Sequence, residues 1–153
     1  MLDDALRVVR QVWSDDDGPF RGRWFDLAET RCSPRPLHPV PVMVGGTDER
    51  KALRLVARHA DACHVFAGGD LGADWVAGRL AALREHCVAE GTSYDAIART
   101  VMWTDPVGPG FVDRMRSLAE VGVDEVHVQA RGSDPVPWVE GLAGVVSALH
   151  ALG

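Results

Sequence analysis

Apolar side chains recur at helical spacing near the start of the chain, at Leu2, Leu6, Val9 and Trp13. The polar run 15–18 and Pro19 predict that this helix ends there, after about twelve residues. Residues 20–27 alternate between apolar and polar side chains, which predicts a short β-excursion. Prolines at 34, 36, 39 and 41 then predict an extended connector, because proline fixes φ and disfavours a helical residue before it.

Four strand-and-helix units follow this connector. The first strand is a short apolar run that stops at two glycines, and the helices carry apolar residues at helical spacing. The predicted strands are 42–44, 62–66, 98–103 and 125–129. The predicted helices begin near residue 47 or 48 and then cover 71–90, 111–121 and 136–149. This alternation with short loops predicts an α/β fold with a parallel sheet.

The length of the chain limits the architecture that these units can form. A chain of 153 residues buries one ordinary core, and no linker interrupts the pattern. We therefore expect a single domain over 1–153, with the leading helix, β-excursion and proline-rich connector in 1–41 and the four βα units in 42–153. A complete (β/α)8 barrel needs about 250 residues, so a barrel built from this chain is partial.

Charge and cysteine content narrow the class of partner. The formal net charge is -6 and the basic residues are scattered along the helices, which argues against nucleic acid or a membrane surface and favours small molecules. Cys32, Cys63 and Cys87 have neither metal-ligand nor redox spacing, so we expect free thiols in a reducing compartment and no metal. The sequence shows no signal pattern and no apolar run of roughly 20 residues, so we expect a cytoplasmic protein.

The best candidate for a binding site is the loop after the first predicted strand. Gly45 and Gly46 let the backbone approach a ligand, and a following helix N-terminus offers N–H groups to an anion such as phosphate. The acidic residues Asp48 and Glu49 oppose this role unless they point away. The alternative is a tight turn capped by Thr47, and the pattern alone leaves both open.

Other candidate residues lie near the predicted strand ends. His64 is placed toward the C-terminal end of its strand, where parallel sheets bind ligands, although a structural histidine is the common alternative. His127 and Gln129 alternate with two valines and are expected on the barrel-interior face, with Gln129 nearer the mouth. Arg131 follows that strand in a loop and suits an anionic ligand, although loop charges are usually only solvated. Hydrolase and dinucleotide-binding motifs are absent.

Long stretches of the sequence resemble the luciferase-like monooxygenase superfamily, especially its F420-dependent oxidoreductases. The resemblance lies in 34–46, 49–63, 80–87, 94–100 and 118–126. It implies that the four units are strands five to eight, the C-terminal half of a TIM-type (β/α)8 barrel. It also implies hydride transfer with the deazaflavin F420, or alternatively FMN, as cofactor.

The resemblance further implies a cofactor site and its limits. Gly45 and Gly46 would supply N–H groups near the phosphate end of the cofactor, with help from Thr47, while His64 faces the pocket. Gln129 and Arg131, which were chosen for their position at the strand end and for charge, complete the expected site. In this family, the first half of the barrel supplies most of the residues that bind the ring of the cofactor, and no part of this sequence matches that half. We therefore assign no catalytic residue and no substrate.

A half-barrel exposes two sheet edges and an uncovered interior face, which favour association. We therefore expect a homodimer, or association with a separate N-terminal half, which would complete the active site. The alternative is a non-catalytic half-barrel that acts as a cofactor-binding or self-association module.

Overall fold

The computed structural model describes residues 1–46, 48, 50–130 and 134–152. The chain divides into two compact units, Met1–Val42 and Met43–Gly153. This boundary lies at the end of the predicted proline-rich connector. That the two units act as a single domain stays a prediction.

The first unit contains a helix and a small hairpin. Helix α1 (Leu2–Val12) is followed by the antiparallel strands β1 (Phe20–Arg21) and β2 (Asp26–Leu27), as the sequence predicted. Asp4 of α1 is buried, and its Oδ2 accepts a hydrogen bond of 2.7 Å from the N–H of Trp24. A polar side chain of the helix therefore fixes the turn of the hairpin.

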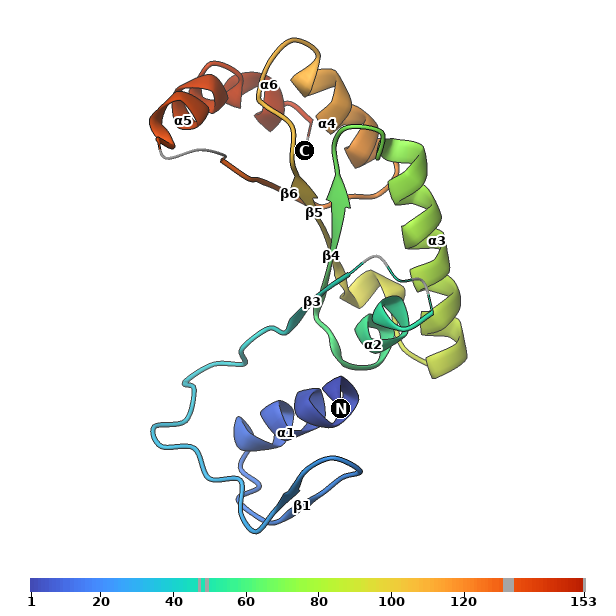
Figure 1. Ribbon diagram of the computed structural model, residues 1–153, viewed down its shortest axis with the longest axis vertical. Helices are drawn as coiled ribbons and strands as arrows, with labels where there is room; N and C mark the ends of the chain where they lie inside the picture. Colours follow the sequence, from blue (N-terminus) through green and yellow to red (C-terminus); the bar gives the residue numbers. More distant parts are fainter. Residues whose placement is uncertain (47, 49, 131–133, 153) are drawn as a thin grey trace. The chain divides into compact units, whose positions relative to one another are not determined.

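The second unit is a four-stranded parallel sheet with strand order β3-β4-β5-β6 (Figure 1). Its strands are β3 (Met43–Gly45), β4 (Ala62–Ala67), β5 (Ala98–Trp103) and β6 (Glu125–Val128). Its helices are α2 (Ala52–His59), α3 (Ala73–Glu90), α4 (Phe111–Glu120), α5 (Val136–Ala143) and α6 (Val146–His150), with a short 3-10 turn at Tyr94–Ala96. This is the predicted α/β fold of four parallel βα units, and within the described residues β3 and β6 are its edges.

Two helices differ from the prediction. Helix α2 was expected from residue 47 or 48 but begins at Ala52, because the carboxylate of Asp48 accepts the N–H of Lys51 at 2.5 Å and forms a turn first. The predicted closing helix 136–149 is two helices. The chain turns at Gly144–Val145, where the N–H of Val145 bonds to the oxygen of Leu142 at 2.9 Å.

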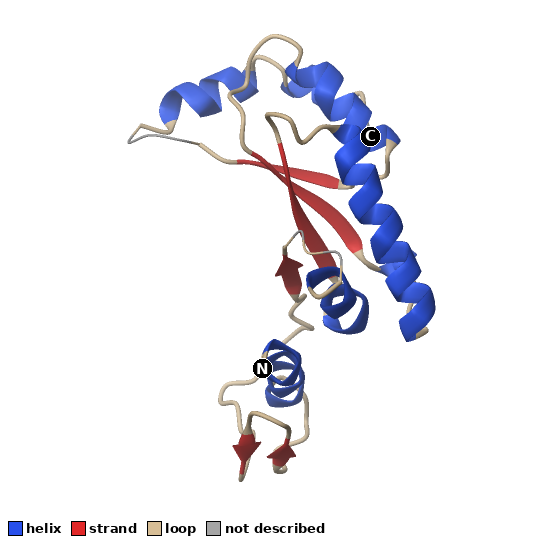
Figure 2. Cartoon of the chain, turned by 45° about the vertical axis from the view of Figure 1, so that its right-hand side comes forward, coloured by secondary structure: helices blue, strands red, loops and turns tan. Residues whose placement is uncertain are grey.

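The two faces of the sheet differ in burial. Cys63, Val65 and Ala67 of β4 are at most 1% exposed on the side where α2 and α3 lie (Figure 2). The residues between them face the other way, and Phe66 is 47% exposed. We call this second side the open face. Strand register places on it Met43, Gly45, His64, Phe66, Thr100, Met102 and His127.

The core lies between the sheet and its helices. Leu53 and Val56 of α2 are buried, as are Val76 and Leu83 of α3. Burial of such side chains contributes roughly 1.5–3 kcal/mol each, so this side supplies most of the hydrophobic stabilisation of the unit. Among the described residues, no helix combines the length and apolarity needed to cross a membrane.

The three cysteines differ in exposure. All are free thiols, as predicted: Cys63 and Cys87 are buried in the second unit, and Cys32 is partly exposed in the first. Burial raises the pKa of the Cys63 thiol. The thiolate of Cys63 is therefore scarce at neutral pH.

Gly46 is expected to tolerate no larger residue. It has φ of +140°, and a Cβ there would lie 2.9 Å from the Cβ of Ala52. Gly46→Ala should lower the free energy of unfolding by about 1–3 kcal/mol, measured by urea denaturation. Gly45→Ala is the control, because its Cβ would lie 3.7 Å from the oxygen of His64 and should cost less than about 1 kcal/mol. Equal losses would contradict this account.

Candidate functional site

The glycine loop lies beside His64. Gly45 pairs with His64 in the register of β3 and β4, and the N–H of Gly46 donates to the oxygen of His64 at 3.1 Å. The absence of a side chain at Gly45 leaves the backbone bare on the open face. A planar ligand can therefore approach the sheet closely at this point.

The N–H groups expected to bind an anion are mostly occupied. The N–H of Gly46 bonds to β4, and the N–H of Lys51 bonds to the Asp48 carboxylate. The N–H groups of Ala52 and Leu53 bond to the oxygen of Asp48 at 3.1 and 3.2 Å. A phosphate would have to displace these bonds, so close approach to Gly45 is the stronger feature of the loop.

His64 lies deeper in the sheet than predicted. It was expected at the C-terminal end of its strand, but it is the third residue of β4, which continues to Ala67. The strand is longer because β5 pairs with it along its whole length, up to Ala67 and Trp103. His64 nevertheless lies beside the end of the shorter β3, and it faces the side that the sequence predicted.

Thr100 holds the imidazole of His64. The two residues are partners in the register of β4 and β5, and His64 Nδ1 lies 2.6 Å from Thr100 Oγ1. Thr100 Oγ1 also donates to the oxygen of Cys63 at 2.8 Å, and Thr100 is only 2% exposed. Sequence reasoning missed Thr100, although alternation in the strand 98–103 could have placed it on the open face.

A second histidine meets His64 across β5. The ring centroids of His64 and His127 are 5.0 Å apart, and His127 Nε2 lies 3.0 Å from the Glu125 carboxylate. The register of β6 confirms that His127 faces the same side as Met102 and Phe66. Within the described part of the chain, no three His, Cys, Asp or Glu side chains gather to hold a metal ion.

The remaining predicted site residues are not joined to this cluster. Gln129 is exposed just beyond β6, and its N–H donates to the oxygen of Trp103 at 3.0 Å. Its place near the strand ends agrees with the prediction, but its role stays a prediction. Thr47 and Arg131 lie outside the described residues.

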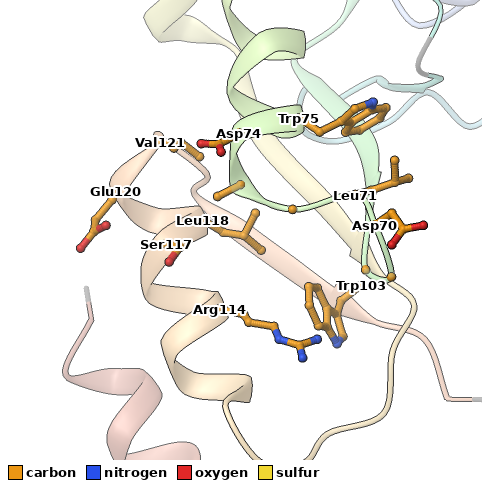
Figure 3. Close-up of a pocket in the computed structure, with 14 residues that line it drawn as sticks. Asp70, Leu71, Asp74, Trp75, Trp103, Arg114, Ser117, Leu118, Glu120 and Val121 are labelled. Carbon is orange, nitrogen blue, oxygen red and sulfur yellow. The ribbon is translucent and has the colours of Figure 1, made fainter.

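The helical side of the sheet carries a separate groove of about 780 Å³, between the start of α3 and α4 (Figure 3). Asp105 shapes it by accepting the N–H of Gly69 at 2.7 Å and the guanidinium of Arg114 at 3.3 Å. Figure 3 shows Arg114 beside Trp103, with Asp70 and Asp74 at the start of α3. Its acidic lining, Asp70, Asp74 and Glu120, does not suit an anionic cofactor.

The electrostatics of the open face keep His64 neutral. Burial lowers the pKa of His64, and the neighbouring His127 lowers this pKa further, while the carboxylate of Glu125 acts in the opposite direction. The imidazole is therefore uncharged at neutral pH. An uncharged imidazole can accept a proton or a hydrogen bond from a ligand.

The parallel sheet agrees with the comparisons to known proteins. The family model of the luciferase-like monooxygenases matches residues 1–106. The chain belongs to this family. Its fold is the C-terminal half of a TIM-type (β/α)8 barrel, as the sequence predicted.

Three known proteins show how much of such a barrel is present. An uncharacterised protein of Mycobacterium tuberculosis is 32% identical over 142 residues, which are 92% of this chain and 44% of that protein. The F420-dependent glucose-6-phosphate dehydrogenase of Kineococcus radiotolerans is 33% identical over 104 residues, 65% of this chain and 29% of that enzyme. An F420-dependent secondary alcohol dehydrogenase, solved with an F420–acetone adduct, superimposes with a TM-score of 0.81 at 14% identity, over 97% of this chain and 61% of that one.

The lowered pKa of His64 makes stability depend on pH. Below the ordinary histidine pKa of about 6.5, the unfolded chain binds a proton that the folded chain binds only at lower pH. The free energy of unfolding should therefore fall as the pH drops through this window, and the slope should be smaller in His64→Gln. Urea denaturation between pH 5 and 7.5 measures both slopes, with His150→Gln on the surface as control. Parallel slopes for wild type and His64→Gln would count against this account.

Proposed function

We propose that this chain forms the C-terminal half of an F420-dependent oxidoreductase that transfers hydride between the deazaflavin and a small organic substrate once a second chain completes the barrel. The observation that carries the proposal is the open face, where Gly45 leaves bare backbone beside the neutral His64. Family membership and the two F420-dependent relatives support the cofactor. FMN is the alternative cofactor.

The residues present fit one side of a deazaflavin pocket. Met43 and Phe66 are 46% and 47% exposed on the open face, and they offer apolar contact to a flat ring. The cofactor would supply the hydride acceptor, while Gly45 permits close contact and His64 offers a hydrogen-bond acceptor. Gly46, Thr47, Gln129 and Arg131 are the other proposed contacts. Hydride transfer also needs a dry pocket, which the other half of the barrel, placed over the open face, would provide.

A non-catalytic module is the second candidate. The occupied N–H groups around Asp48 favour it, because they remove much of the expected phosphate site. Such a module would bind a cofactor weakly, or it would only associate with another chain. The partner in either case is a second copy or a separate N-terminal half, with no nucleic acid or membrane involved, and we propose a cytoplasmic location.

Cofactor binding separates these candidates. Titration of the protein with F420, followed by quenching of cofactor fluorescence, should give saturable binding that Gly45→Val weakens at least tenfold, because its side chain blocks the bare backbone. Gly78→Ala, in the exposed part of α3 where a Cβ meets nothing within 4 Å, should bind like wild type. A parallel titration with FMN tests the alternative. If neither cofactor is quenched up to about 100 μM, which corresponds to roughly 5.5 kcal/mol of binding free energy, the proposal that this chain binds F420 or FMN would be refuted.

The oligomeric state of the protein tests whether a second chain covers the open face. We expect light scattering to show dimers at micromolar concentration, because they cover the open face. Phe66→Glu should shift the protein toward monomers by placing a charge on that face. Val88→Glu is the matched control, since Val88 is 80% exposed on α3. The proposal that a second chain completes the barrel would be refuted if the wild-type protein stayed monomeric and also did not bind an added N-terminal half-barrel.

A further inference from the structure

Helices α5 and α6 carry an exposed apolar surface next to the β6 edge of the sheet. Neither helix contains a buried residue, and Val136, Val139 and Val146 are 54%, 63% and 40% exposed. In a parallel sheet, the helix that follows a strand packs over that strand and the next one. Within the described residues no strand follows β6, so a strand from another chain can take that place.

Both edge strands direct backbone N–H groups away from the sheet. The N–H of Gly46 bonds to the oxygen of a β4 residue, so the N–H of the preceding residue, Gly45, points outward from β3. At the other edge, the N–H of Gln129 bonds to β5, so the N–H of Val128 points outward from β6. Each edge can therefore hydrogen-bond to a further parallel strand.

The two edges carry opposite charge. Residues 50–59, which include α2 beside β3, have four basic and no acidic side chains, a net charge of +4. Residues 120–140, which run from the end of α4 through β6 into α5, have five acidic side chains and one basic one, a net charge of -4. The flank of β3 is therefore basic and the flank of β6 is acidic.

Part of this charge is already paired within the chain. Glu90 of α3 binds two arginines of α2 at 2.7 Å each, and Arg99 binds the carboxylate of Asp124 at 2.6 Å. Among the residues that the structure describes, no ion pair is seen for the side chain of Lys51, at the start of α2, or for that of Glu140 on α5. These side chains are exposed and available to a partner.

Opposite charges on the two edges select a second copy of this chain as the partner. A copy that turns its β3 edge toward β6 places its basic flank beside the acidic one. Pairing of like edges, β3 with β3 or β6 with β6, would instead bring like charges together, which costs free energy. A two-fold axis along the strands repeats the favourable contact and keeps all eight strands parallel.

We propose that two copies of this chain bind through unlike edges, with β3 and α2 of each copy against β6 and α5 of the other. This inference rests on the proposed function and names the partner that completes the barrel. The strand β3 of one copy then lies beneath α5 of the other, which buries the exposed valines. Both open faces turn inward, so the surface beside Gly45 and His64 is enclosed by the two copies together.

Charge reversal tests the contact between unlike edges. Sedimentation velocity is measured at micromolar concentration and about 0.01 M salt, where charges act over about 30 Å. Lys51→Glu and Glu140→Lys should each weaken dimerisation by about tenfold or more, because each places like charges at both contacts. An equimolar mixture of the two variants should dimerise like wild type, because every contact again joins opposite charges. Glu85→Lys on the exposed side of α3 is the matched control and should also dimerise like wild type.

The pairing of like edges gives a different pattern in this experiment. Lys51→Glu would then replace one pair of like charges by another, and neither variant would weaken the dimer. Unchanged dimerisation of the two variants, or a mixture that dimerises no better than its components, would overturn the proposal.

Amide hydrogen exchange tests whether the edge strands form the contact. The N–H groups of Gly45 and Val128 should exchange about tenfold or more slowly in wild type than in Lys51→Glu at the same concentration, because the partner's strand binds them. The N–H groups of Gly46 and Gln129, which are bonded within the sheet, are the internal controls and should change less. Equal exchange of Gly45 and Val128 in both proteins would show that the copies join elsewhere, and this would also overturn the proposal.

The outcomes separate this inference from the proposed function. A wild-type monomer that binds an added N-terminal half-barrel would overturn the pairing of two copies and leave the proposed function intact. Dimers that meet the two tests above but bind neither F420 nor FMN would support the pairing and refute the proposed function.

Discussion

The pairing of β4 with a strand on each side is the constraint on which the rest of the second unit depends. Side chains alternate between the faces of a strand, so this pairing sends Cys63 and Val65 beneath the helices and His64 and Phe66 to the open face. A slip of one residue would bury the imidazole and expose the core. The burial of β4 against α2 and α3 therefore determines which side chains lie on the open face.

Local patterns predicted the elements of this fold well. The strand Ala98–Trp103 has the predicted bounds, and the polar residues Thr104 and Asp105 follow its apolar end. The start of α2 and the break at Gly144 depend on single hydrogen bonds of Asp48 and Val145, which periodicity does not reveal. Apolar spacing thus determines where a helix exists, and local polar groups determine where it ends.

The candidate site was only partly visible in the sequence. The glycine loop and His64 could be named from their places beside predicted strands. The contact of His64 with Thr100 and His127 needs the register of three strands, which follows from packing and not from any one segment. Within the second unit, α2 and α3 pack on the other side of β4, and Phe66 of the open face is 47% exposed. The two proposed functions, an enzyme half and a binding module, would therefore use the same surface.

The distribution of the cysteines gives the protein built-in reporters of local opening. Cys32 is partly exposed in the first unit, while two thiols are buried in the second, Cys63 on β4 and Cys87 on the buried side of α3. An alkylating reagent would therefore modify Cys32 directly. It would reach the other two thiols only when α2 or α3 leaves the sheet, so their alkylation rates record how often the covered side opens.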